Sequence, residues 1–285
     1  MNRPWLLLPL VCMLLLLILP AQSPLLGQIR DIPDEHHSWG RFDSGAWRLA
    51  RIATQSFDKD GKPLGTTTTM ERITLVGIRR GYATLRIESV LEVGGKVFES
   101  PVRTISVGYH GEEIGNRTQM EDLGTENANI DGNPIACRVK QYQIRDDDQH
   151  KQVKIYYSNQ VAPYILRRET VITSNDAPEP DYRNNLQVVA LDRPHEVLDQ
   201  IKSTSHLIIE KKNGKSNTTK TAIHALDIPG EVIRYESDEK DNKGHLIRQS
   251  SMELIDYGYS EPDDEFDITR RHSRRKDKRR SRRRK

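Results

Sequence analysis

Residues 47–93 read WRLARIATQSFDKDGKPLGTTTTMERITLVGIRRGYATLRIESVLEV, and this stretch decides the fold class. Trp47 to Phe57, Thr66 to Ile78 and Tyr82 to Val93 are rich in β-branched and apolar residues that partly alternate with polar ones. Such alternation is typical of half-buried strands. Asp58 to Lys62 and Arg79 to Gly81 separate them with turn residues. The stretch therefore predicts three consecutive antiparallel strands joined by hairpin turns.

The same pattern continues over most of the chain. Further strands are predicted at Lys96–Glu99, Arg103–Tyr109, Ile135–Ile144, Gln152–Tyr157, Tyr164–Thr173, Leu186–Leu191, His206–Lys211, Thr218–Ala225, Val232–Ser237 and His245–Tyr257. About twelve short strands with little helix indicate a mainly β fold. We expect an antiparallel meander that forms a curled sheet, a half-barrel or a sandwich, because each of these protects the sheet edges.

Two segments interrupt this pattern. Asp192 to Ile201 is predicted as one short helix, because Val197, Leu198 and Ile201 would share a face and Asp192 could cap its start. Residues 111–134 are polar and rich in Gly, Asn and Glu, which predicts a loop.

The β domain, residues 46–258, contains two similar hairpins. Asp58 to Gly65 leads into Thr66–Val76, and Glu239 to Leu246 leads into Ile247–Ile255. Both are an acidic turn followed by a strand. Either the domain consists of two related halves, about 46–110 and 135–258, or the hairpins have converged on the same turn chemistry.

The N-terminus predicts export. Arg3 precedes an apolar stretch, Trp5 to Leu19, which is shorter than the ~20 residues of a membrane-spanning helix. Residues 1–27 are therefore predicted to be a signal peptide, and 28–45 a polar lead. An uncleaved signal anchor is the alternative. We expect a periplasmic or extracellular protein, with membrane association as a further option.

This layout resembles a known group of proteins. An exported chain of long antiparallel hairpins is similar, over roughly residues 46–258, to the curled half-barrel of the bacterial lipoprotein-carrier and related periplasmic families. The resemblance implies a concave face that holds acyl chains, although the long apolar helices that line the carriers' cavity are absent from this sequence. The segment from Ile228 to Gly258 also resembles exported bacterial β-rich proteins of uncharacterised function, which implies a compartment and no chemistry.

Motifs for catalysis, cofactors or metals are missing from the sequence. It contains no nucleophile elbow, phosphate-binding loop or dinucleotide fingerprint, and no two histidines have metal-site spacing. His36 and His37 are interpreted as a solvated loop pair, and Asp58 to Lys62 as a hairpin turn, since Thr69 stands where a calcium loop needs a closing acid. Cys137, the one cysteine after the signal, is interpreted as a small buried strand residue. We therefore predict no catalytic site, no cofactor and no metal.

The C-terminal segment, residues 259–285, carries the strongest functional signal. It is acidic up to Asp267 and then basic, and it has too little apolar surface to fold, so we expect disorder. Residues 270–285 carry +11 in a chain of net charge +3, which leaves −8 for the remainder. The predicted polyanion-binding residues are Arg270, Arg271, Arg274, Arg275, Lys276, Lys278, Arg279, Arg280, Arg282, Arg283, Arg284 and Lys285.

These features favour one function and leave two alternatives. The first is an exported, non-catalytic β-sheet binding or structural protein, held to anionic envelope surfaces or polymers by its basic tail. The second is a lipid or lipoprotein carrier with an apolar cavity, and the third is a secreted enzyme with a dispersed site. Sequence-specific nucleic-acid binding is not expected, because the tail has no aromatic residue for base stacking. The sequence predicts no particular oligomeric state.

Overall fold

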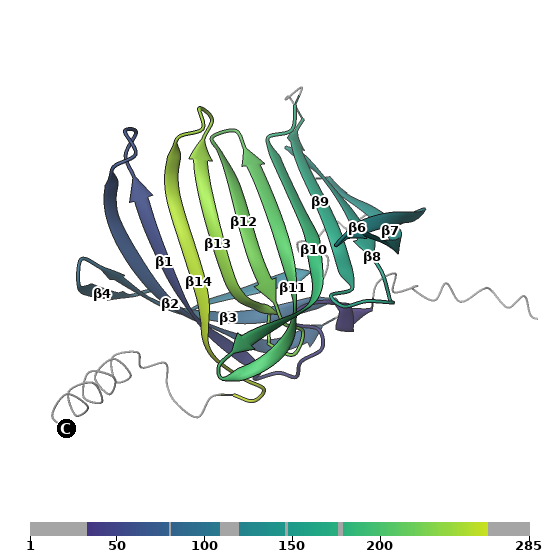
Figure 1. Ribbon diagram of the computed structural model, residues 1–285, viewed down its shortest axis with the longest axis horizontal. Coiled ribbons are helices and arrows are strands. Elements are labelled where there is room, and N and C mark those ends of the chain that lie inside the picture. Colours follow the sequence, from purple (N-terminus) through teal and green to yellow (C-terminus); the bar gives the residue numbers. More distant parts are fainter. Residues whose placement is uncertain (1–32, 80, 109–119, 146–147, 176–178, 262–285) are drawn as a thin grey trace, which may run out of the picture. The chain divides into compact units, whose positions relative to one another are not determined.

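The computed structural model describes residues 33–79, 81–108, 120–145, 148–175 and 179–261. In these residues the chain forms one fourteen-stranded antiparallel sheet (Figure 1). The strands are β1 (Trp47–Phe57), β2 (Pro63–Arg79), β3 (Tyr82–Val93), β4 (Lys96–Glu99), β5 (Arg103–Gly108), β6 (Glu121–Ile130), β7 (Asn133–Arg145), β8 (Gln149–Tyr157), β9 (Ile165–Ser174), β10 (Tyr182–Val197), β11 (Gln200–Asn213), β12 (Ser216–His224), β13 (Val232–Asp241) and β14 (Leu246–Gly258). The predicted mainly β, antiparallel meander is confirmed.

The order of the strands explains how the sheet is built. From one edge to the other it runs β4-β3-β2-β1-β14-β13-β12-β11-β10-β9-β8-β7-β6, with β5 also paired to β3. The first strand, β1, thus lies inside the sheet, and the strands from β2 to β4 follow it outward to one edge. The chain resumes at β6, the opposite edge, and returns strand by strand until β14 pairs with β1. The sheet is open, because β4 and β6 do not pair with each other.

The β1–β2 and β13–β14 hairpins use the same five-residue turn. In the first, Asp58 Oδ1 accepts hydrogen bonds from the backbone amides of Asp60 and Lys62, at 2.9 and 2.8 Å. In the second, Asp241 Oδ1 accepts from the amides of Lys243 and His245, at 2.8 and 2.9 Å. The fourth turn residue is a glycine with φ of +77° or +88°. The hairpin interpretation of Asp58 to Lys62 is therefore correct.

The predicted helix at Asp192–Ile201 is wrong. This segment is the hairpin that ends β10 and begins β11, with Val197 paired to Gln200. Leu198 and Asp199 form its two-residue turn, with φ of +48° and +66°. Backbone pairing with neighbouring strands therefore outweighs the local spacing of apolar residues. In the described residues the only helical turn is the three-residue 3₁₀ segment Asp34–His36.

The predicted loop over residues 111–134 is also wrong in part. Residues 109–119 lie outside the described residues, but Glu121–Ile130 forms β6, paired along its length with β7. The strand was missed because its side chains are nearly all exposed, so it lacks the apolar alternation that marks an internal strand.

The strands from β10 to β14 and β1 lie side by side (Figure 1), and the two faces that they form differ in burial. Since side chains alternate along a strand, residues paired in register share a face. One row consists of Val188, Leu207, Ala222, Tyr235, Met252 and Ile52. Its members are buried or half-buried, and we call this side the buried face. The next row, Gln187, Ile208, Thr221, Glu236, Ser251 and Ala53, lies on the exposed face.

The described part of the polar lead packs against the sheet. Trp39 is 6% exposed and contributes to an apolar cluster with Leu75, Ala83 and Leu85. The backbone carbonyl of Ser38 accepts a 3.0 Å hydrogen bond from the amide of Gly230. Gly230 has φ of +74°, and an added Cβ would lie 2.8 Å from the Trp39 ring. The turn after β12 therefore requires glycine at this position, because a side chain there would clash with Trp39 of the lead.

Candidate functional site

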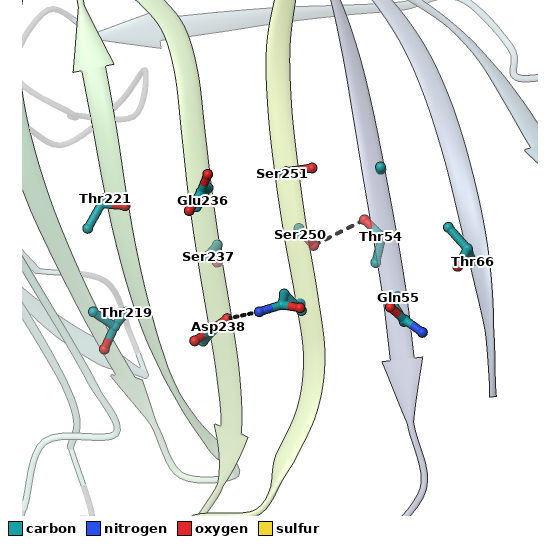
Figure 2. Close-up of a pocket in the computed structure, with 12 residues that line it drawn as sticks. Thr54, Gln55, Thr66, Thr219, Thr221, Glu236, Ser237, Asp238, Ser250 and Ser251 are labelled. Atoms are coloured by element: carbon teal, nitrogen blue, oxygen red, sulfur yellow. Dashed lines mark hydrogen bonds between the residues drawn. The ribbon is translucent and has the colours of Figure 1, made fainter. Parts of the chain in front are cut away.

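A shallow trough of about 500 Å³ lies on the exposed face, across strands β12, β13, β14, β1 and β2 (Figure 2). Its lining residues are Ala53, Thr54, Gln55, Thr66, Thr219, Thr221, Glu236, Ser237, Asp238, Gln249, Ser250 and Ser251. Thr54, Ser237 and Ser250 belong to a row whose side chains project from the buried face. Of the nine lining residues on the exposed face, eight carry a hydroxyl, amide or carboxylate group, so the trough is suited to a polar ligand.

The trough carries negative charge at its β13 side. Glu236 and Asp238 both project there, and Asp238 Oδ1 accepts a 3.0 Å hydrogen bond from Gln249 Nε2 (Figure 2). Arg234 Nη2 lies 2.7 Å from Glu236 Oε1 and neutralises that carboxylate in part. Hydroxyls and amides can donate and accept hydrogen bonds, whereas carboxylates repel anions. The trough therefore favours a neutral polar or cationic group.

A more apolar groove of about 330 Å³ adjoins the trough and shares Thr221 and Glu236 with it. Ile208 and Ile223 supply its apolar side chains from the exposed face, and His206 and Arg234 border them. Burial, together with the nearby His195 and Arg193, lowers the pKa of His206 below its ordinary value. Because this groove lies on the exposed face, an apolar chain bound in it would keep one side in water.

A buried charged network joins the polar lead to the end of β12. Glu231, 7% exposed, lies 2.8 Å from Arg41 Nη1 and 3.4 Å from His224 Nδ1. Burial alone would raise the pKa of the Glu231 carboxyl, but the His224 hydrogen bond and the charges of His224 and Arg41 outweigh it, so the pKa is lowered. Arg41 also donates to the carbonyl of Leu226 at 2.9 Å. This network anchors the lead.

The predicted polyanion-binding residues, Arg270 to Lys285, lie outside the described residues, as does the predicted signal peptide. Cys137 is fully buried in β7, as expected, and burial raises the pKa of its thiol. The interpretation of His36 and His37 as a solvated pair is wrong. Both are half-buried, and the His36 ring stacks on Tyr164 with the ring centres 3.9 Å apart.

The described residues contain neither a metal-binding cluster nor a membrane-spanning helix. No group of three or more His, Cys, Asp or Glu side chains is placed to hold a metal ion there. No helix in that part of the chain is both long enough and apolar enough to cross a bilayer.

The trough and the Glu231 network were missed by the sequence analysis. The trough's residues come from five strands that span positions 53–251, and only the register of the sheet brings them together. Arg41 and Glu231 are 190 positions apart. Glu231 did carry a local signal, since it follows Ile228-Pro229-Gly230, which was predicted as a turn.

No protein-family model and no curated protein matches the sequence. Among solved structures, the chain is similar to a candidate exported protein with a YmcC-like fold from Bacteroides fragilis, at 8% identity and a TM-score of 0.30, covering 75% of this chain and 97% of that one. It is similar to a candidate lipoprotein from Parabacteroides distasonis, at 9% identity and a TM-score of 0.30, covering 76% and 97%. MucB in complex with MucA(peri) is similar at 8% identity and a TM-score of 0.15, covering 73% and 89%. Exported β-rich proteins and a MucB complex, the kinds of protein that the sequence resembles, are thus among the similar structures, all at TM-scores of 0.30 or below.

Proposed function

We propose that this chain is an exported β-sheet binding protein, held to anionic surfaces or polymers by its basic C-terminal tail. The observation that carries the proposal is the separation of charge along the chain. Residues 270–285 hold twelve Lys and Arg and one acid, while the rest of the chain sums to −8. At an anionic membrane surface each nearby Lys or Arg contributes roughly 1 kcal/mol of attraction.

The charges on the exposed face are a reason to assign attachment to the tail and not to the sheet. Its trough contains Glu236 and Asp238, and Glu253 projects from the neighbouring part of β14. Glu236 is paired with Arg234 and Glu253 with Arg51, so the exposed face offers an anionic membrane or polymer no concentration of positive charge comparable to the tail. The sheet would instead remain free to bind a polar ligand in the trough while the tail holds the protein in place.

Export itself is supported by the predicted signal peptide at residues 1–27, whose apolar stretch is preceded by Arg3. An export test would fuse residues 1–45 to a reporter that is active only outside the cytoplasm. We expect activity from this fusion and none when Leu14, Leu16 and Ile18 are replaced by Asp. A reporter that stays inactive with the native segment would contradict export.

A liposome experiment tests the tail. The full chain would be compared with a variant in which all twelve Lys and Arg of residues 270–285 are Gln, and with one in which these residues are scrambled. We expect the native and scrambled tails to bind anionic vesicles equally and the neutralised tail to bind at least tenfold more weakly, because the attraction depends on charge and not on sequence. Equal binding by the neutralised variant would contradict the proposal, and so would loss of binding by the scrambled one.

A further inference from the structure

A second groove, of about 360 Å³, lies on the buried face of strands β10–β14, on the opposite side of the sheet from the trough. Three cations line it: Lys211 of β11, Lys220 of β12 and Arg248 of β14. We call it the cationic groove. A single carboxylate, Glu239 of β13, lines it with them.

The register of the sheet brings these cations together from separate strands. In one row across the sheet Lys211 pairs with Thr218, Thr218 with Glu239, and Glu239 with Arg248. In the adjacent row Lys220 pairs with Ser237, which pairs with Ser250. Lys220 and Lys211 are thus diagonal neighbours on one face. The Cα atoms of such neighbours lie roughly 7–8 Å apart.

Two of the three cations have no acidic partner in the part of the chain that the structure describes. The Lys220 ammonium lies 4.1 Å from the centre of the Tyr235 ring, and the Lys211 ammonium lies 5.4 Å from that of Tyr182. Neither forms an ion pair with a described residue. Only Arg248 has one, to Glu239 at 3.4 Å, and Glu239 also accepts a 2.8 Å hydrogen bond from Ser216.

The surroundings of Lys220 add further positive charge. Arg48 is half-buried on the same face and donates to the carbonyl of Val232 at 3.2 Å, while its Nε is buried without a hydrogen-bond partner. Burial, Lys211 and Arg48 all lower the pKa of Lys220. Glu71 offsets part of the Arg48 charge. Holding like charges together without a counterion is unfavourable, and an external anion would relieve it.

Neutral polar groups complete the lining. Thr218, Ser237 and Ser250 present hydroxyls on the same two rows as the cations. Asn184 lines the groove from β10, and its side-chain oxygen position is buried without a hydrogen-bond partner. Rotating this amide would place its NH₂ group there as a donor.

We propose that the cationic groove binds a phosphate group, carried either by a soluble phosphomonoester or by a lipid headgroup. A phosphate can accept several charge-assisted hydrogen bonds at once, and Lys211, Lys220 and Arg248 supply the charge that such bonds need. The sequence gives no sign of this site, because its cations are scattered over 38 positions among other basic residues.

The test is calorimetric titration of the full chain with inorganic phosphate and with glycerol 3-phosphate. Lys211→Met and Lys220→Met remove one cation each while keeping an apolar stem. Lys212→Met is the matched control, because Lys212 is the next residue of β11 and projects from the exposed face. The basic tail is present in every variant, so its contribution cancels from the comparison.

We expect each groove variant to weaken binding about tenfold, the control to leave it unchanged, and Lys220→Arg to retain most of it. Equal affinity in all variants would overturn the proposal, and so would equal weakening by the Lys212 control. Circular dichroism would identify a variant that fails to fold, and Lys220→Arg keeps the test decisive in that case.

The source of the phosphate is distinguished by a second arm. Vesicles that contain phosphatidic acid would be compared with glycerol 3-phosphate, using the neutralised-tail variant so that attachment through the tail is absent. Tighter binding to vesicles identifies a headgroup, and tighter binding to the soluble compound identifies a free ligand. No binding to either would overturn the proposal, while the tail function would stand on its own vesicle experiment.

Discussion

The two faces of the sheet treat charged residues differently. On the exposed face, Arg51 pairs with Glu253 at 2.8 Å and Arg234 with Glu236 at 2.7 Å. On the buried face, Lys211 and Lys220 have aromatic rings beside them and no acidic partner among the described residues. Arg248 on the buried face is paired with Glu239, but the half-buried Lys220 has no such partner in the described part of the chain, whereas these two exposed arginines do.

This difference indicates separate purposes. Exposed ion pairs contribute about 0–1 kcal/mol each to the free energy of unfolding, so they keep the surface polar and change the stability little. A half-buried lysine without a counterion is a liability for folding. Lys220 is such a lysine, and Lys211 lies diagonal to it on the same face, which suggests that their counterion comes from outside the chain.

The largest contrast is expected between two glutamates near β13. Glu231→Gln removes the charge that compensates Arg41 and His224 in a buried site, and we expect a loss of about 3–5 kcal/mol in the free energy of unfolding. Glu236→Gln removes an exposed partner of Arg234 and should cost less than about 1 kcal/mol. Urea denaturation of both variants measures the contrast. Similar losses would show that the Glu231 network does not hold the lead.

The same network predicts a dependence on pH. The folded state lowers the pKa of Glu231 below its ordinary value of 4.5. Its stabilising contribution is therefore complete above that value and is lost as the pH falls through the lowered pKa. We expect the stability of the native chain to fall more steeply below about pH 4.5 than that of Glu231→Gln. Parallel curves would contradict this assignment.

Adjacent residues of β11 test the assignment of the faces. Leu207 is 3% exposed and packs with Val188 and Ala222, so Leu207→Ala should cost about 2–5 kcal/mol. Ile208 is half-buried on the exposed face, and Ile208→Ala should cost about 1 kcal/mol. Thermal denaturation would compare them. A larger loss of stability for Ile208→Ala than for Leu207→Ala would show that the two faces are assigned the wrong way round.

A smaller effect of opposite sign is expected at the cationic groove. Lys220→Met should raise the free energy of unfolding by about 1 kcal/mol at neutral pH, because it removes a charge that burial, Lys211 and Arg48 disfavour. A base whose pKa is lowered by folding destabilises the fold below that pKa, and the penalty disappears as the pH rises towards 10.5. The gain should therefore shrink at alkaline pH. Denaturation at pH 7 and pH 10 measures it, and a loss of stability at pH 7 would contradict the account.

The last prediction concerns the reactivity of the Cys137 thiol, which can be measured without changing the sequence. Burial raises the pKa of Cys137, so little thiolate forms at pH 8 in the folded chain. We expect a thiol reagent to label the native protein at least tenfold more slowly than the urea-unfolded protein. Comparable rates would show that the β7 core opens readily.

The sequence was a good guide where turns and strands carry their own signals. Trp47–Phe57, Tyr82–Val93 and Lys96–Glu99 are strands with the predicted bounds, because a glycine-containing turn adjoins each of them and they have alternating or β-branched residues. It was a poor guide at Leu198 and Asp199, which form a tight turn with positive φ although neither is Gly or Asn. It also missed β6, which pairs through its backbone while its side chains stay in water.

The grooves were beyond sequence analysis for a physical reason. The residues that meet in the trough or in the cationic groove come from five strands, so their grouping depends on the register of all five. Each bulge changes that register. The shifts between Val188 and Ala190 and between Ala190 and Arg193 change the phase of β10. Lys211 and Lys212 look equivalent in the sequence, yet they project from opposite faces.

The measurement that tests the central claim most directly is the salt dependence of binding to anionic vesicles, for the native chain and for the neutralised-tail variant. If the basic tail attaches the protein, the logarithm of the native affinity should fall linearly and steeply with the logarithm of salt concentration, as displaced counterions require. The variant should bind weakly at every salt concentration. Equal affinities and equal slopes for the two proteins would contradict attachment through the tail.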